Sequence, residues 1–127
     1  MVAIVDYGVG NLFSLVSSLK AVGADAVVTG DAEGIKKADK LILPGVGAFG
    51  DAAKKLKSSG LFEHVISEAK SGKPLLGICL GMQMMSCYKK DVNLITVEDI
   101  QDIIEAKLKE NSYEDVYLSF SDYRKKR

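Results

Sequence analysis

The sequence predicts an α/β domain: an open parallel sheet of about four strands with helices on both faces, followed by a two-helix hairpin. Three observations support this prediction. Short continuous apolar runs alternate with helically spaced segments up to residue 86, which is typical of parallel strands covered on both faces. Glycine-rich turns follow three of the apolar runs. Residues 82–127 contain neither glycine nor proline, and from Thr96 on their apolar residues recur at helical spacing.

The elements of the first part follow from apolar runs, turn residues and capping residues. Strands are expected at 2–6, 26–28, 40–43 and 74–78. Helices are expected at 11–22, 31–37, 49–57 and 61–71, with Asn11 capping the first and Gly23 ending it. Right-handed crossovers place the carboxyl ends of all strands on one edge of the sheet. The turns at 7–10, 44–47 and 79–81 are therefore expected to meet there.

The residues after the fourth strand have a different composition. All 12 glycines lie in residues 1–81, so we place a boundary between Ser86 and Asp91, with an α/β part at 1–88 and a tail at 89–127. The tail is expected to form two helices, the first starting at Thr96 and the second spanning about 113–125. Their apolar faces are Ile100, Ile103, Ile104 and Leu108 on the first, and Val116, Tyr117, Phe120 and Tyr123 on the second. We expect this hairpin to pack on the first part.

Charge and composition exclude several classes of function. Lysine and arginine total 17, against 17 aspartates and glutamates, so no electrostatic footprint for nucleic acid or an anionic membrane is present. No apolar run is long enough to span a bilayer and no signal peptide is recognisable. Two cysteines without a secretory signal indicate a reducing compartment. We expect a cytoplasmic protein with no metal and no cofactor.

The stretch from Pro74 to Gln83 predicts a nucleophile elbow at Cys79. Gly77 and Gly81 flank the cysteine at a strand-to-helix turn, where larger side chains would block the turn. Amides at the start of the following helix, together with its dipole, favour a thiolate. The alternative is a small buried cysteine that fills the end of a strand. Cys87 lacks these features and is expected to be plain packing.

The remaining candidates carry weaker signals. Gly8-Val9-Gly10 is expected to be a tight turn, because the third glycine of a dinucleotide fingerprint is replaced by Phe13. The turn 44–47 either donates amides to an oxyanion or is a simple connection. His64 is the sole histidine and lies off the apolar face of its helix, so we expect a surface residue. A cysteine nucleophile normally needs a histidine base, and none is apparent here.

Residues 1–86 resemble the N-terminal half of the glutaminase subunit of imidazole glycerol phosphate synthase, a class I glutamine amidotransferase of histidine biosynthesis. The matching stretches are residues 4–11, 43–51 and 72–83. The resemblance implies that Cys79 attacks the glutamine amide, forms a glutamyl thioester and releases ammonia. It implies an oxyanion hole from the amides of Leu80 and of the turn at Val46 and Gly47, and a glutamine contact from Gln83.

The same resemblance implies a partner, a (β/α)8-barrel cyclase subunit that receives the ammonia, with the turn 7–11 near the interface. The family's second half supplies the catalytic histidine and glutamate, and nothing after residue 86 matches it. Residues 95–105 and 123–127 instead resemble the C-terminal part of the ATP-cone, a nucleotide-binding module of ribonucleotide reductases. The basic hairpin of that module is absent.

Together these resemblances imply a truncated or chimeric chain. Our first hypothesis is a glutaminase-like domain that keeps Cys79 but has little or no turnover. The alternatives are a non-enzymatic scaffold of recombined segments and, less well supported, a nucleotide-binding regulatory fragment. An exposed sheet edge would also permit self-association.

Overall fold

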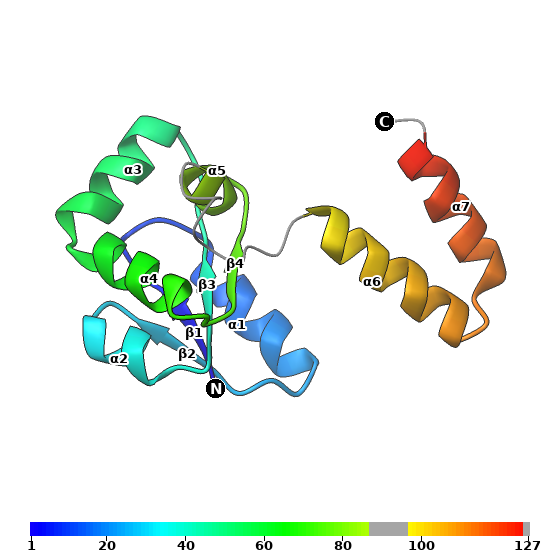
Figure 1. Ribbon diagram of the computed structural model, residues 1–127, viewed down its shortest axis with the longest axis horizontal. Coiled ribbons are helices and arrows are strands. Elements are labelled where there is room, and N and C mark those ends of the chain that lie inside the picture. Colours follow the sequence, from blue (N-terminus) through cyan, green and yellow to red (C-terminus); the bar gives the residue numbers. More distant parts are fainter. Residues whose placement is uncertain (87–96, 126–127) are drawn as a thin grey trace. The chain divides into compact units, whose positions relative to one another are not determined.

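The computed structural model describes residues 1–86 and 97–125. The chain divides into two compact units, Met1–Leu94 and Ile95–Arg127 (Figure 1). Residues 87–96 lie outside the described ones, and they include Cys87, the predicted helix start at Thr96 and most of the predicted boundary between Ser86 and Asp91. The expected packing of the tail on the first part stays a prediction.

The first unit is built on a four-stranded sheet in which every neighbouring pair is parallel. Its strands are β1 (Val2–Val5), β2 (Ala26–Thr29), β3 (Lys40–Leu43) and β4 (Leu75–Gly77). The order is β2-β1-β3-β4, with Ile4 in register with both Val28 and Ile42. The predicted α/β fold is confirmed. Chain order reverses between β1 and β3, and open sheets of this kind place ligands beyond the carboxyl ends of such strands.

Five helices connect or follow the strands: α1 (Leu12–Ala21), α2 (Ala32–Lys37), α3 (Phe49–Ser58), α4 (Leu61–Lys70) and α5 (Leu80–Ser86). The two predicted ends of α1 are confirmed. The Asn11 side chain accepts a hydrogen bond from the Ser14 amide at 3.2 Å. Gly23 follows the helix with a φ of 74°, a conformation that glycine adopts without strain.

The main cluster of buried residues lies on one face of the sheet, although Ile4 and Ile42 on the other face are buried as well. Ala3, Val5, Leu41, Leu43 and Leu75 alternate along the strands and join a single buried cluster with residues of α2, α3, α4 and α5. Figure 1 shows α2, α3 and α4 on one side of the sheet and α1 on the other. Among the ten residues of α1 none is buried, and Phe13 is 83% exposed. The face under α1 is therefore the less completely covered one.

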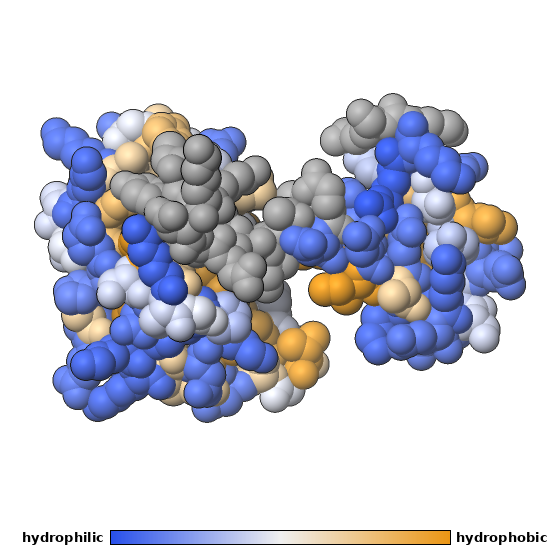
Figure 2. Space-filling model, in the orientation of Figure 1, coloured by the Kyte–Doolittle hydropathy of each residue, from blue (hydrophilic) through white to orange (hydrophobic). Residues whose placement is uncertain are grey.

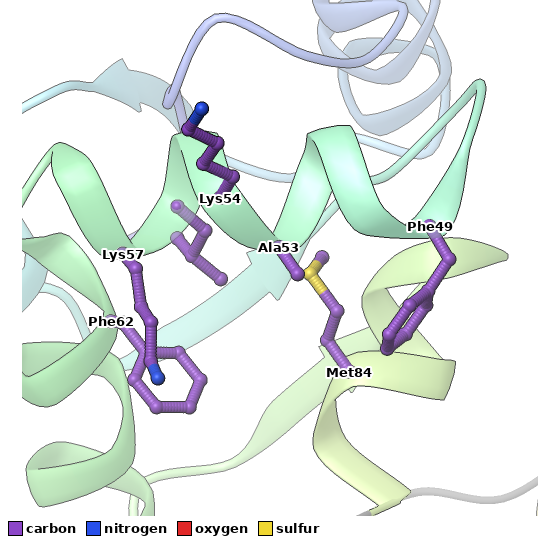
Figure 3. Close-up of a pocket in the computed structure, with 7 residues that line it drawn as sticks. Phe49, Ala53, Lys54, Lys57, Phe62 and Met84 are labelled. Carbon is purple, nitrogen blue, oxygen red and sulfur yellow. The ribbon is translucent and has the colours of Figure 1, made fainter.

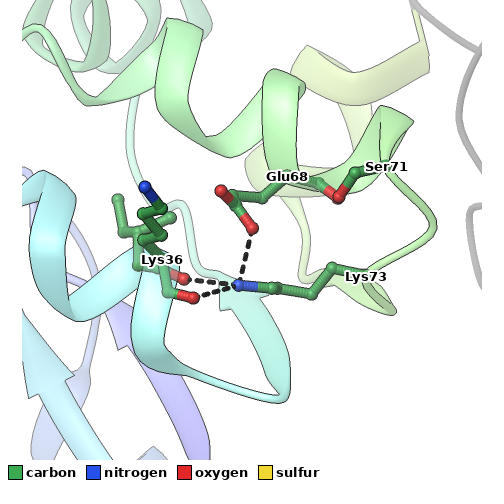
Figure 4. Close-up of polar contacts among 5 residues, drawn as sticks. Lys36, Glu68, Ser71 and Lys73 are labelled. Atoms are coloured by element: carbon green, nitrogen blue, oxygen red, sulfur yellow. Dashed lines mark hydrogen bonds and ion pairs between the residues drawn. The ribbon is translucent and has the colours of Figure 1, made fainter.

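Lys73, just before β4, contacts both α4 and α2 (Figure 4). Its ammonium group lies 2.7 Å from Glu68 Oε2, at the end of α4. It also donates to the carbonyl oxygens of Ile35 at 2.9 Å and Lys36 at 2.8 Å. These carbonyls belong to the last turn of α2, which a cation stabilises. The Lys73 side chain is 11% exposed, so water is largely excluded from the contact.

Replacing Lys73 with methionine is expected to lower the free energy of unfolding by about 1–3 kcal/mol, since one carboxylate and two carbonyls lose a charged donor. Urea denaturation followed by circular dichroism measures the change. Lys37→Met is the control, because Lys37 pairs with Glu33 on the same helix α2 but is 68% exposed. Equal losses in the two variants would contradict the proposed role of Lys73.

The second unit contains a helical hairpin, as predicted, made of α6 (Val97–Glu110) and α7 (Glu114–Lys125). Ser112 turns the chain with a φ of 58°. Arg124 Nη1 on α7 contacts Asp102 on α6 at 2.9 Å and Glu105 at 3.1 Å, and Lys109 Nζ lies 4.5 Å from the centre of the Tyr117 ring.

No described side chain of this hairpin is buried. The predicted apolar row of α6 is at the surface, with Ile103 58% exposed and Ile104 39% exposed. Figure 2 shows hydrophobic residues on the surface of this unit among mainly hydrophilic ones. The hairpin by itself therefore does not bury the row that the sequence predicted.

Candidate functional site

The turns after β1, β3 and β4 meet at one edge of the sheet. The Tyr7 hydroxyl of the first turn donates to the Pro44 carbonyl of the second at 2.6 Å. The third turn follows β4, where the Ile78 amide donates to the Leu43 carbonyl at 3.0 Å. The Leu80 amide donates to the Gly45 carbonyl at 3.4 Å. The predicted convergence of the three turns is confirmed.

Cys79 has a strained backbone in the third of these turns, directly after β4. Its φ is 53°, and Ser112 is the other non-glycine residue with a positive φ in the described part of the chain. The left-handed conformation costs roughly 1 kcal/mol for a residue with a Cβ. Cys79 is exposed, so it does not fill the core as the alternative hypothesis required. A strained, exposed cysteine between a strand and a helix has the geometry of a nucleophile elbow.

Three glycines allow close packing here, Gly45 and Gly81 between the second and third turns and Gly77 within the third. A Cβ on Gly45 would lie 2.7 Å from Leu80 Cβ, and one on Gly77 would lie 2.6 Å from Met82 Cα. A Cβ on Gly81 would overlap the Leu43 carbonyl oxygen. None of these three has a positive φ. Glycine is needed at these positions for space rather than for backbone freedom.

Two of the predicted oxyanion donors, the backbone amides of Leu80 and Val46, do not point to the same place in this conformation. The Leu80 amide is engaged by the Gly45 carbonyl. Because the peptide group is planar and trans, the Gly45 carbonyl and the Val46 N–H point in opposite directions. The Val46 N–H therefore points away from Leu80. Rotation of the Gly45–Val46 peptide would free the Leu80 N–H and bring the Val46 N–H to the same side.

The remaining candidates lie on helices α4 and α5. Gln83 is exposed on α5, and its backbone N–H donates to the backbone carbonyl of Cys79 at 3.2 Å. Gln83 is four positions after Cys79, which places it about one helical turn farther along the chain. His64 is exposed on α4, as predicted. The buried side of that helix consists of the predicted residues Leu61, Phe62, Val65, Ile66 and Ala69.

The described residues contain no cluster of three or more histidine, cysteine, aspartate or glutamate side chains that would hold a metal ion. In the same part of the chain, no helix is both long enough and apolar enough to cross a membrane.

An apolar hollow that the sequence did not reveal lies among α3, α4 and α5 (Figure 3). Its volume is about 240 Å³, and its walls include Phe49, Ala53, Phe62 and Met84, with Lys57 beside Phe62. None of the predicted site residues lines it. Phe49 and Met84 belong to the helices that follow the second and third turns, but sequence spacing does not show that these helices meet.

Comparison with known proteins places these features in a family. The family model for glutamine amidotransferase class-I matches residues 3–115. The chain is 55% identical over 85 residues to imidazole glycerol phosphate synthase subunit HisH of Wolinella succinogenes, covering 67% of this chain and 42% of that protein. It is 53% identical over 85 residues to the protein of the same name from Caldanaerobacter subterraneus subsp. tengcongensis, with the same coverage.

A crystal structure of a glutamine amidotransferase superposes with a TM-score of 0.55 at 26% identity, over 64% of this chain and 43% of that one. The chain spans about two fifths of the length of the curated relatives it matches. The family match runs to residue 115, so the prediction that nothing after residue 86 matches the family is wrong for residues 87–115. The resemblance of the tail to an ATP-cone and a chimeric origin stay predictions. The match over most of the sequence shows that this chain belongs to the class I glutamine amidotransferase family.

Proposed function

We propose that the first unit is a glutaminase-like domain in which Cys79 accepts the γ-glutamyl group of glutamine. The Cys79 sulfur attacks the side-chain amide carbon and a C–S bond forms. The C–N bond then breaks and the amide nitrogen takes up the proton that the thiol gives up. Ammonia departs, and the glutamyl group stays on Cys79 as a thioester. The observation that carries this proposal is the strained, exposed elbow at Cys79, with a φ of 53°, where three turns converge.

In this proposal the amides of Leu80 and of the turn at Val46 and Gly47 stabilise the oxyanion, and Gln83 contacts glutamine. The Gly45 carbonyl occupies the Leu80 amide, so the Gly45–Val46 peptide has to rotate before the hole forms. Removing one oxyanion donor costs an enzyme about 2.7–4 kcal/mol of transition-state stabilisation. The resting conformation is therefore expected to react slowly with glutamine.

The proposed setting is histidine biosynthesis in the cytoplasm, because the relatives are named as subunits of imidazole glycerol phosphate synthase. A (β/α)8-barrel cyclase subunit is the proposed partner. The turn after β1 lies at the same edge as Cys79, through the contact of Tyr7 with Pro44, which supports delivery of ammonia at that edge. Self-association is a further proposal, since β4 ends the strand order of the sheet and sheet edges can pair.

The test is the intact mass of the protein after incubation with 6-diazo-5-oxo-L-norleucine, an electrophilic glutamine analogue. The Cys79 sulfur would bond to the diazo-bearing carbon, which gains the thiol proton and releases N₂. We expect one adduct, which is lost in Cys79→Ala and kept in Cys87→Ala. Absence of an adduct on the folded wild-type chain would favour the non-enzymatic scaffold instead.

A further inference from the structure

The turn after β1 contacts Pro44 in two ways, through a hydrogen bond and through close packing. The Tyr7 hydroxyl donates to the Pro44 carbonyl at 2.6 Å, and Tyr7 is only 6% exposed. The backbone of Gly10 approaches the proline ring so closely that a Cβ there would lie 3.0 Å from Pro44 Cβ. Lys55 Nζ on α3 donates to the Gly8 carbonyl at 3.4 Å, which links the same turn to the helix after the second turn.

These contacts lie next to the Gly45–Val46 peptide, whose carbonyl accepts the hydrogen bond from the Leu80 amide. The Pro44 carbonyl belongs to the Pro44–Gly45 peptide, and the next peptide contains the Gly45 carbonyl that accepts from Leu80. Each peptide group is planar. A hydrogen bond that holds the Pro44 carbonyl therefore fixes the orientation of the whole Pro44–Gly45 peptide group. Glycine cannot fix its own orientation, since it lacks a Cβ.

We propose that Tyr7 is a positioning residue: its hydroxyl holds Pro44 so that the Gly45–Val46 peptide takes defined orientations beside Cys79. The inference rests on the proposed function, because positioning matters chemically only if the turn donates to an oxyanion. Rotation of a single peptide into a useful orientation requires that the residues flanking it stay in place. With the Pro44 carbonyl released, the turn would sample many orientations and the productive one would be rarer.

The ring and the hydroxyl of Tyr7 have separable roles. The ring belongs to the buried cluster of the core, and a phenylalanine ring would pack in the same volume. The hydroxyl adds a polar group that needs a partner when buried, and burial raises the pKa of Tyr7 above its ordinary value. Tyr7→Phe therefore removes the contact with Pro44 and keeps the packing.

Amide hydrogen exchange tests the inference without relying on activity. In Tyr7→Phe we expect the Leu80 amide to exchange about tenfold faster than in the wild-type chain, which corresponds to the loss of one hydrogen bond. Lys73→Met is the matched control, since it is expected to lower stability through α2 and α4 rather than through the turns. If Tyr7→Phe and Lys73→Met have the same free energy of unfolding and their Leu80 amides also exchange at the same rate, the inference is overturned.

Two reactions of Cys79 then separate positioning from a general loss of structure. Iodoacetamide alkylates the thiolate with loss of iodide and needs no oxyanion hole. L-Glutamic acid γ-(4-nitroanilide) transfers its glutamyl group to Cys79 with release of 4-nitroaniline and does need one. We expect Tyr7→Phe to lower the limiting rate of acylation about tenfold, with the concentration for half-maximal rate and the alkylation rate unchanged.

The outcomes distinguish the two proposals. A wild-type chain that is alkylated but never acylated contradicts the proposed function, while the exchange of the Leu80 amide still decides whether Tyr7 holds the turn. A wild-type chain that is acylated, with Tyr7→Phe acylated equally fast, overturns the role of Tyr7 and leaves the proposed function intact.

Discussion

Replacing Gly81 with alanine is expected to destabilise the first unit by about 3 kcal/mol or more, the upper range for overpacking a tightly fitted site. The added methyl group would overlap the Leu43 carbonyl oxygen and lie 2.8 Å from its carbonyl carbon. That carbonyl accepts the hydrogen bond from the Ile78 amide, so it cannot move without breaking the connection between β3 and the third turn. Both colliding groups are backbone, and neither can rotate away as a side chain would.

Urea denaturation of the wild-type chain and Gly81→Ala measures this loss. Gly50→Ala is the matched control, because Gly50 lies in α3 and a Cβ there would meet nothing within 4 Å. Alanine in an open helical position is expected to stabilise by about 0.5–1 kcal/mol. A change at position 81 that is no more destabilising than the change at position 50 would contradict the close approach of β3 and α5.

The two glycine substitutions show what sequence can predict about this site. The flanking glycines and the strand-to-helix pattern predicted an elbow at Cys79 and the need for small residues beside it. The obstacle at Gly81, however, is the Leu43 carbonyl, 38 positions earlier in the chain. A contact between residues so far apart depends on which strands are neighbours, and local residue patterns do not encode that.

The helices were predictable because their pattern is local, whereas the contacts between the turns join residues far apart in the chain. The apolar spacing of α4 predicted both its buried residues and the exposure of His64, because one helix face is a local property. The hydrogen bond from Tyr7 to Pro44 joins two turns across the β1–β3 pair, and nothing in either turn indicates it. The engagement of the Leu80 amide by Gly45 is likewise a conformational fact that the motif leaves open.

The tail shows a third case. Its two helices and their apolar rows were predicted from spacing alone, and the hairpin is present. Spacing does not say what covers such a row, and Ile103 is 58% exposed. Amphipathic pattern predicts that a face can be buried, whereas the partner that buries it is a tertiary or quaternary property.

Incubation of the chain with glutamine is expected to release about one equivalent of ammonia per chain, after which ammonia release stops. A single thiol is acylated, and no base is present to drive hydrolysis of the thioester. Hydrolysis of the glutamyl thioester needs an activated water molecule. The sole histidine of the sequence, His64, is exposed on α4 and lies outside the three turns. Loss of the histidine base in a serine-protease triad lowers kcat on the order of 10⁶-fold, so turnover is expected to be lower by several orders of magnitude.

A coupled ammonia assay at protein concentrations comparable to the ammonia released measures the plateau, and intact mass identifies the retained glutamyl group. Cys79→Ala is expected to release none. Sustained ammonia release at a constant rate would contradict the prediction, since it would require a base that the turns do not contain. Added imidazole provides the sharper experiment, because a small diffusible base can replace a missing histidine only where the acyl group is already held on Cys79. A rate after the plateau that rises with imidazole concentration would show that the elbow works and that the base alone limits the reaction.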